Sequence, residues 1–469
     1  MSGTSEESIA SADIGDRLSG PRVGVVTGRG EFKARADSEG NYLYSPGSPK
    51  FNQVQSFVSA QKTLDLLQEY ADRRIDWAFD SNELGVIPHA GEGKNAYYAR
   101  WNQSVAFYSF DSRPLGRRVH TAVSSDVVSH ETGHAILDGL KPEWGKTFDK
   151  ETKATHEAFG DCAAMLLALS RPDNRRDALE KTGGDLTRDN CISSIAEEFG
   201  EAVRLANRDP NDDRPYLRNA NNSFRYRPPS ELPNDGSREE LSAEPHSFCQ
   251  IFTRAFYNSV VNVYQDKVSG GVEQDAALEQ AGQVVGRALA RGLTMASPNR
   301  SRFADVALAM LRAEELQGGR HTEALARAFT SSDILRPEQL AELERPLPTG
   351  SPLEVAELLG AKEYDLVRSV SDRQGYTTHE FLLSEETAVA APGWSLSEPL
   401  LIDVTAGLSL TYNSAGQLVH VAHQKKDPES EVHGLPDAAA LFNGEASDEV
   451  ARSWSESGLK LEQLPIFRD

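Results

Sequence analysis

Two histidines and a glutamate lie within five residues of one another in the segment SSDVVSHETGHAILDGL, residues 124–140. Four residues are slightly more than one helical turn, so a helix here would present His130 and His134 on one face. Two imidazoles at this spacing can hold a zinc ion, and Glu131 beside them can act as a general base. So short a motif also occurs in ordinary helices, and a zinc site needs a third ligand from elsewhere in the chain.

A candidate third ligand lies downstream, in the segment THEAFGD. Glu157 is far enough from His134 for one helix to end and a second to return. Asp161 lies four residues after Glu157, on the same helical face, where it can accept the spare N–H of a ligand histidine. His156 is a rival ligand, but adjacent helical residues point about 100° apart, so we expect only one of the pair to bind the ion.

The composition is that of a soluble globular protein with more than one domain. The chain has 469 residues, and this length predicts two or three domains. Its formal net charge is −22. A nucleic-acid partner is not expected, because binding a phosphate backbone requires clustered Lys and Arg.

Neither a secretory signal nor a membrane span is predicted. Residues 1–20 lack a basic start followed by an apolar core, and we predict a disordered tail there. No run of about 18 apolar residues occurs, so no membrane partner is expected. Cys162, Cys191 and Cys249 are odd in number and far apart, which predicts no disulfide framework. These features predict a cytoplasmic protein, although export by another secretion route would leave no trace in them.

Hydrophobic periodicity divides the rest of the chain into three parts. Residues 21–140 predict a β-rich lobe, with short strands in 22–46, a helix at 51–74, paired strands in 95–111 and the helix at 124–140. Residues 141–345 predict a helical lobe, interrupted by a long loop at 209–245; its core helices are expected at 158–169, 194–206, 247–264, 277–293 and 303–316. Residues 353–469 form an extension of unknown role, α/β or β-rich, with a hairpin around NSAG at 413–416.

The segment DVVSHETGHAILDGL, followed by HEAFGD, resembles the thermolysin family, the gluzincin zinc peptidases whose third ligand is a glutamate. The resemblance covers residues 20–335. It implies an α+β fold, in which a zinc cleft separates a β-rich lobe from a helical lobe. It also implies zinc held by His130, His134 and Glu157, with Glu131 as the catalytic base.

The same resemblance assigns further site residues. NAYY is similar to the family's edge strand, which casts Asn95 and Ala96 as binders of the substrate backbone. YLRNANN resembles the segment with the substrate-carbonyl arginine, here Arg218, and EPHSFCQ resembles the helix with the transition-state histidine, here His246. Each assignment has an alternative: a solvated arginine, a helix-capping histidine, or ordinary turn and strand residues.

The chain departs from the family at the transition-state groups. The family places a tyrosine between the second histidine and the ligand glutamate, whereas this chain has none there. The acid that orients the family's transition-state histidine is replaced by Leu241, which leaves Glu239, Glu240 or Glu244 as substitutes.

The family's calcium site is also incomplete. Asp126, Glu198 and Glu201 match its acidic positions, but Ala168 and Ala196 stand where two more acids are expected. Calcium binds through oxygen ligands, so we expect weak calcium binding if any.

Two classes of function remain open. The first is zinc-dependent endoproteolysis of protein or peptide substrates. The second is a non-catalytic or tail-inhibited protein of the same fold, which acts as a scaffold or effector through residues 353–469. The sequence identifies neither the substrate nor the oligomeric state.

Overall fold

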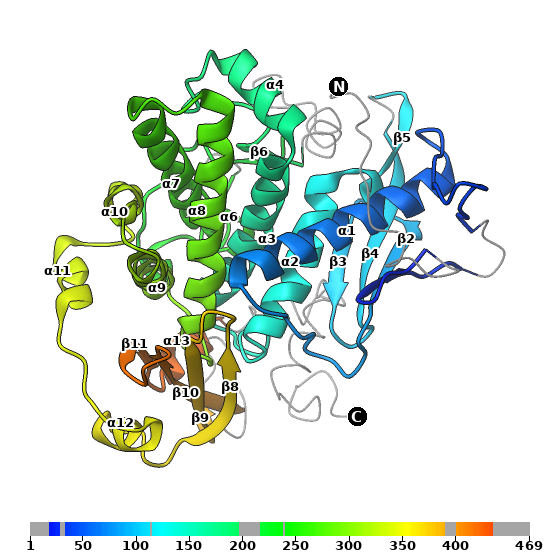
Figure 1. The fold of residues 1–469 in the computed structure, drawn as a ribbon. Coiled ribbons are helices and arrows are strands. Elements are labelled where there is room, and N and C mark those ends of the chain that lie inside the picture. The colour runs from blue at the N-terminus through cyan, green and yellow to red at the C-terminus, as the bar shows by residue number, and fades with distance from the viewer. Residues whose placement is uncertain are drawn as a thin grey trace, which may run out of the picture.

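The N-terminal part of the molecule is built on a five-stranded mixed sheet. The computed structural model describes residues 18–28, 33–112, 115–196, 216–237, 240–389 and 400–434 (Figure 1). The strand order is β1-β2-β4-β3, with β5 also paired to β4. The first three strands are parallel, while β3 and β5 run antiparallel to β4. The strands are β1 Val23–Val25, β2 Leu84–Glu92, β3 Ala96–Ala99, β4 Ser104–Ser112 and β5 Arg117–His120.

Helix α1 (Pro49–Ala71) joins this sheet to the helices. Its first turn is capped by Ser48, whose hydroxyl accepts a hydrogen bond from the backbone N–H of Phe51. Phe57 and Leu64 are fully buried on its inner face, which packs against β2, α2 and α8. One continuous hydrophobic core therefore spans the sheet and the helical part.

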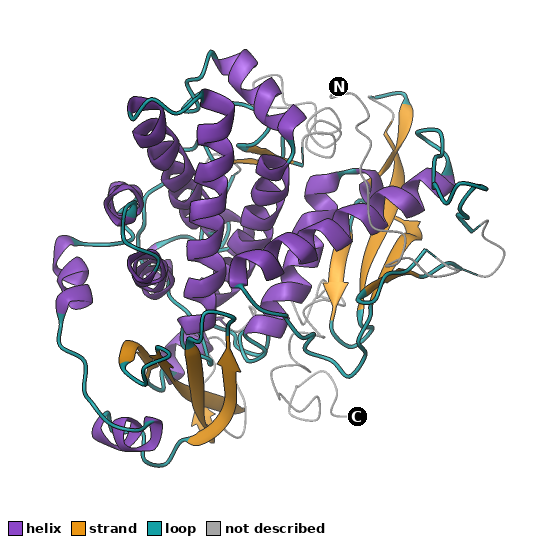
Figure 2. Ribbon diagram, viewed as in Figure 1, coloured by secondary structure: helices purple, strands orange, loops and turns teal. Residues whose placement is uncertain are grey.

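The middle of the chain is mainly helical, and its helices lie beside the N-terminal sheet and above a second sheet in the view of Figure 2. Its helices are α2 Ser125–Leu140, α3 Lys150–Ser170, α4 Pro172–Thr182, α6 Pro245–Phe248, α7 Gln250–Ser269, α8 Gln274–Met295, α9 Phe303–Leu316, α10 Thr322–Ser331 and α11 Pro337–Leu340. Two short strands, β6 Ser194–Ile195 and β7 Arg218–Asn219, pair beside them. Among the described helices, none is long and apolar enough to cross a membrane.

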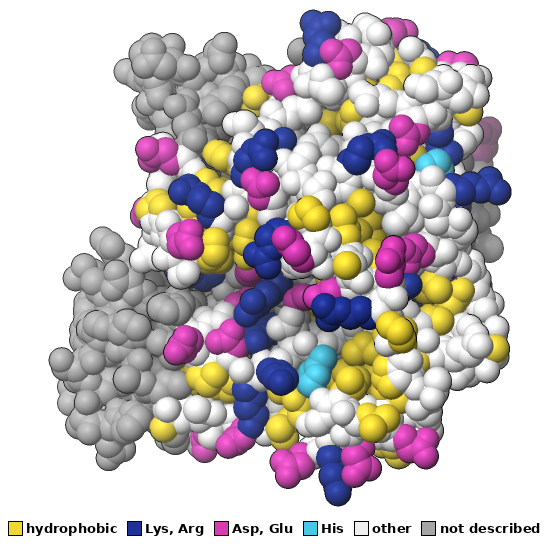
Figure 3. Space-filling model, turned by 90° about the vertical axis from the view of Figure 1, so that its left-hand side faces the viewer, with side chains coloured by type: hydrophobic (Ala, Val, Ile, Leu, Met, Phe, Trp, Pro, Cys, Tyr) yellow, Lys and Arg dark blue, Asp and Glu magenta, His cyan; other side chains and the backbone are white. Residues whose placement is uncertain are grey.

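Residues 352–389 and 400–434 form a compact unit below these helices, hereafter the C-terminal module (Figure 1). Its antiparallel sheet has the order β11-β10-β9-β8 and a small core of its own around Phe381, Leu408 and Leu410. The elements are α12 Pro352–Leu358, β8 Asp365–Ser371, β9 Thr377–Val389, β10 Leu400–Tyr412, β11 Leu418–Gln424 and α13 Pro428–Gly434. On the face that includes α10 to α12, acidic and basic side chains are interspersed, as is typical of a solvated surface (Figure 3).

The fold is mixed α and β, and most predicted elements are confirmed. The helix at 51–74, the paired strands in 95–111 and the hairpin around NSAG are all present. The short strands expected in 22–46 are wrong at 26–28 and 33–46, where the backbone is irregular apart from turns, while residues 29–32 lie outside the described residues. The helix expected at 194–206 is wrong at its start, where Ser194–Ile195 is a strand. The remainder of that segment, 197–206, and residues 1–17 of the predicted tail lie outside the described residues.

Candidate metal centre

Helices α2 and α3 approach closely because each carries a glycine at the contact. A Cβ atom on Gly160 would lie 2.6 Å from Nδ1 of His130, and one on Gly133 would lie 3.2 Å from Cα of Gly160. No other residue type would leave this space empty. Each helix also has a side-chain cap at its N-terminus, Ser124 for α2 and Asp149 for α3. The facing sides of the two helices can therefore bring their polar residues together.

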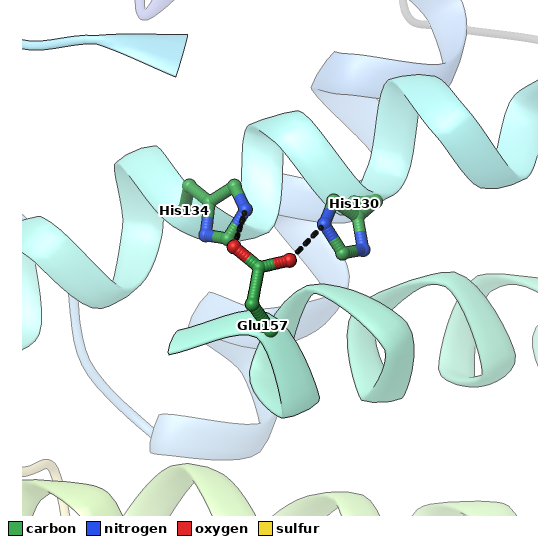
Figure 4. Close-up of side chains that lie close together, drawn as sticks. All are labelled: His130, His134 and Glu157. Carbon is green, nitrogen blue, oxygen red and sulfur yellow. Dashed lines mark ion pairs between the residues drawn. The ribbon is translucent and has the colours of Figure 1, made fainter. Parts of the chain in front are cut away.

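His130 and His134 on α2 point toward Glu157 on α3 (Figure 4). Nε2 of His130 lies 3.2 Å from one Glu157 oxygen, and Nε2 of His134 lies 3.5 Å from the other. The candidate ligand atoms of the three residues all lie within 4.8 Å of one another. Two imidazole nitrogens and one carboxylate, with room for a further ligand, form the donor set of catalytic zinc sites.

The electrostatics of the cluster fit a cation. Oε2 of Glu157 is buried and accepts no hydrogen bond, although it lies beside His130 and His246. Burial disfavours the charged form of Glu157, yet the neighbouring histidines hold its pKa well below the usual range. Burial lowers the pKa of His134 to about 4, so the ring is neutral at neutral pH, which is the form of histidine that binds a metal ion. A buried carboxylate oxygen that faces imidazole nitrogens and accepts no hydrogen bond is a group that a metal ion would satisfy.

Asp161 holds the other side of His130. Its Oδ1 lies 3.0 Å from Nδ1 of His130, so the contact expected from the helical spacing is present. Burial opposes protonation of His130, but Asp161 and Glu157 together raise its pKa to about 10. Arg218 donates to both oxygens of Asp161, at 2.9 and 2.6 Å. The Asp161 carboxylate is therefore shared between an imidazole and a guanidinium.

His156 contacts a ligand histidine and lies apart from the ligand set. Its Nδ1 lies 3.2 Å from Nδ1 of His134, the nitrogen opposite the one that faces Glu157. Burial holds the pKa of His156 well below its ordinary value, so the ring is neutral, and one of the two facing nitrogens can donate a hydrogen bond to the other. Of the adjacent pair His156 and Glu157, only Glu157 belongs to the group of candidate ligands.

Glu131 is buried beside the cluster, with 8% of its surface exposed. Burial raises the pKa of Glu131 to about 7, against the opposing effect of His130 and of a hydrogen bond from the Tyr98 backbone. A carboxyl group with a pKa near neutrality can both take up and release a proton under physiological conditions.

His246 is the most exposed member of the cluster, with 55% of its side chain accessible. It lies at the start of α6, and its Nε2 is 3.3 Å from Glu157. Its Nδ1 lies 2.6 Å from Glu244, so Glu244 takes the orienting position that Leu241 cannot fill. Glu157, helped by Glu244, raises the pKa of His246 to about 9 despite partial burial. Of the other two candidate acids, Glu240 has no such contact and Glu239 lies outside the described residues.

Asn95 and Ala96 lie at the start of β3, the edge strand of the N-terminal sheet. The Asn95 side chain accepts a hydrogen bond from the backbone N–H of Ala96 at 2.9 Å. The same strand is fixed to α2, because the Tyr98 hydroxyl donates to Asp138 at 2.6 Å. The edge strand predicted from NAYY is therefore tied to the helix that carries both histidines.

The calcium residues are described only in part. One Asp126 oxygen accepts a hydrogen bond from the Ala196 backbone at 3.1 Å, and burial raises the pKa of Asp126. Glu198 and Glu201 lie outside the described residues, so calcium binding stays a prediction.

Three features of the centre had no counterpart in the sequence predictions: the contact between His156 and His134, the sharing of Asp161 with Arg218, and the link from Tyr98 to Asp138. Of these residues, the sequence could have indicated only Asp138, because it follows His134 by four residues and so lies on the same helical face. The other two join segments that no local pattern relates.

No protein-family model matches the chain, and no curated protein matches it. The function is therefore inferred from the residues of the centre.

Proposed function

We propose that the protein is a zinc-dependent endopeptidase that resembles the thermolysin family. One observation carries the proposal: His130, His134 and Glu157 converge as a two-nitrogen, one-oxygen donor set, with the buried carboxyl of Glu131 beside it. A bound zinc ion would supply a Lewis acid at this point. Protein or peptide chains are the proposed substrates.

Glu131 is the proposed general base. With a pKa of about 7 it takes a proton from the attacking water and then passes that proton to the leaving amine. Its burial keeps competing water away from the proton.

His246 and Arg218 are the proposed stabilisers of negative charge on the scissile carbonyl oxygen. With its pKa raised to about 9, His246 carries a proton at neutral pH and can donate from Nε2. Arg218 is held by Asp161 through two of its donors. These two groups take over the role of the tyrosine that the chain lacks between His134 and Glu157.

The proposed substrate chain lies along β3. An extended peptide can pair with an exposed edge strand through backbone hydrogen bonds. The link from Tyr98 to Asp138 would keep that strand in register with the histidines on α2.

The test combines metal content with cleavage of unfolded casein. We expect one zinc per chain by mass spectrometry, and loss of about 10³-fold or more in kcat for Glu131→Gln, because the variant has no proton acceptor. Glu323→Gln is the matched control; this residue lies on α10 with 88% of its side chain exposed, and its activity should equal that of the wild type.

Two results would contradict the proposal. A wild-type protein that contains no zinc would refute the assignment of the metal centre. One zinc per chain with no cleavage by either protein would favour the alternative function, a non-catalytic protein that acts through its C-terminal module.

A further inference from the structure

Residues 141–149, hereafter the α2–α3 connection, join the two helices that carry all three candidate ligands. The connection contains no helix or strand, yet Lys141 and Trp144 within it are fully buried. It joins the end of α2, which carries both histidines, to the start of α3, which carries Glu157. What fixes this segment therefore bears directly on the metal centre.

The first end of the connection is held by Arg368 on β8. The last carbonyl groups of a helix have no partner within the helix, and a cation near them is favourable. Arg368 donates to the carbonyl oxygen of Gly139 at 3.0 Å and also to that of Leu140, the last residue of α2. A residue of the C-terminal module thus caps the helix that carries His130 and His134.

Lys141 extends this contact into a buried charge network. Its ammonium group donates to Glu380 on β9 at 2.5 Å and to the carbonyl oxygens of Thr294 and Ala296. Glu380 also accepts from Arg368, its cross-strand neighbour, at 2.7 Å. The three donors of Lys141 are therefore all used, as a fully buried ammonium requires.

The second end of the connection is held by α13. The Glu431 carboxylate is 5% exposed and accepts from the Phe148 backbone N–H at 2.7 Å and from the Thr147 hydroxyl. Ser430 donates to Asp149, the N-cap of α3. The C-terminal module thus also fixes the first turn of the helix that carries Glu157.

The module itself is braced against the helical part. Ser409 on β10 donates to the Ala296 carbonyl at 2.8 Å, and Asn299 donates to the Thr405 carbonyl at 3.0 Å. Trp144 donates to Ser297 at 3.0 Å, so the middle of the α2–α3 connection rests on the same segment. The middle of the α2–α3 connection therefore contacts the same segment, residues 296–299, to which the module is hydrogen-bonded.

We propose that the C-terminal module is a positioning element of the metal centre, which sets the distance between Glu157 and the two histidines by holding both ends of the α2–α3 connection. Arg368 and Glu431 are its positioning residues. This inference rests on the proposed function, because it assumes that these ligands bind zinc. It also assigns the module a role other than inhibition: among the described residues, none in the module forms a hydrogen bond or ion pair with the ligands, with Glu131 or with His246.

The test compares Arg368→Gln and Glu431→Gln in the full-length protein with two matched controls. Glu385→Gln lies on β9, where the side chain is 62% exposed, and Arg373→Gln lies in the β8–β9 turn, where it is 74% exposed. Zinc affinity is measured by competition with a chelator. Coordination geometry is read from the absorption bands of the Co²⁺-substituted protein, and the mobility of residues 141–149 from hydrogen exchange.

We expect Arg368→Gln and Glu431→Gln to bind zinc about tenfold or more weakly than the wild type, which is the usual effect of losing a group that supports a ligand. Their Co²⁺ spectra should change and amides 141–149 should exchange faster, while both controls match the wild type. Arg368→Lys keeps a cation at the end of α2 and should restore part of the affinity, which a general loss of stability would not explain.

Unchanged zinc affinity and Co²⁺ spectra in both variants would overturn the inference. Wild-type protein that binds neither zinc nor Co²⁺ would overturn the proposed function instead, so the two failures are distinguishable. If one variant does not fold, the other tests the opposite end of the connection independently.

Discussion

At the scale of single residues, Gly160 sets how near α3 can come to His130. The space that a Cβ atom would occupy is filled by the imidazole, at 2.6 Å from Nδ1. In an exposed helix the change from Gly to Ala is stabilising by about 1 kcal/mol, but here the added methyl group must displace either the ring or the helix. The site therefore accepts a poor helix former for a geometric reason.

Gly160→Ala should weaken zinc binding by about tenfold or more, because the displaced His130 loses its contact with Asp161. Gly133→Ala is the graded comparison, since its Cβ would meet the neighbouring helix at 3.2 Å, and it should have a smaller effect. Zinc titration of both variants checks this order, and equal affinities in Gly160→Ala and the wild type would contradict the close contact.

At the scale of elements, strand β3 and helix α2 act as one unit. The Tyr98 hydroxyl and the Arg100 guanidinium both donate to Asp138, which lies one turn beyond His134. This charged hydrogen-bond network joins the edge of the sheet to the helix that carries two candidate ligands. Local sequence pattern predicted the strand and the helix separately, but no periodicity relates residue 98 to residue 138.

Tyr98→Phe should lower the free energy of unfolding by about 1.5–3 kcal/mol, the usual value of a hydrogen bond to a charged group. On the proposed function, casein cleavage should show a higher KM with a smaller change in kcat, because the strand proposed to bind substrate loses its register with α2. Tyr42→Phe, which removes a hydroxyl group outside the sheet, is the control. Urea denaturation measures the free energy of unfolding, and an unchanged midpoint in Tyr98→Phe would refute the predicted loss of stability.

The element scale also shows where sequence reasoning stops. The candidate ligands His130, His134 and Glu157 could be predicted from the sequence, because residues three or four apart lie on the same face of a helix. The sequence left three acids as possible partners of His246. It could not single out Glu244, because the short helix α6 determines which acid faces the ring. The strands expected in 33–46 were wrong because their alternation has no sheet partner in the described part of the fold.

At the scale of the whole molecule, stability depends on pH through buried carboxyl groups far from solvent. Glu151, in the first turn of α3, accepts hydrogen bonds from the Phe303 backbone at 2.7 Å and from Tyr226 at 3.0 Å. Burial raises the pKa of Glu151 to about 8, with Asp149 adding to the effect. The folded protein therefore favours the protonated form, whereas in the unfolded chain Glu151 has the ordinary glutamate pKa of 4.5.

A raised folded-state pKa gives stability that is complete below pH 4.5 and is lost as the pH rises toward 8. Between these values the contribution of Glu151 should fall by about 1.4 kcal/mol per pH unit. Glu151→Gln removes the titration but keeps the shape, so the difference between wild type and variant should follow this slope. Denaturant unfolding at several pH values measures it, and parallel curves for the two proteins would show that Glu151 does not titrate in this range.

The contacts between the C-terminal module and the α2–α3 connection join residues that are far apart in the sequence. Leu140 and Arg368 are 228 residues apart, and Phe148 and Glu431 are 283 residues apart. Proteins are synthesised from the N-terminus, and early segments can fold before later ones exist. On the proposed role of the module, a growing chain exposes its histidines and Glu157 well before Glu431 leaves the ribosome. On the proposed function, proteolytic competence would then be postponed during translation until the module has been synthesised.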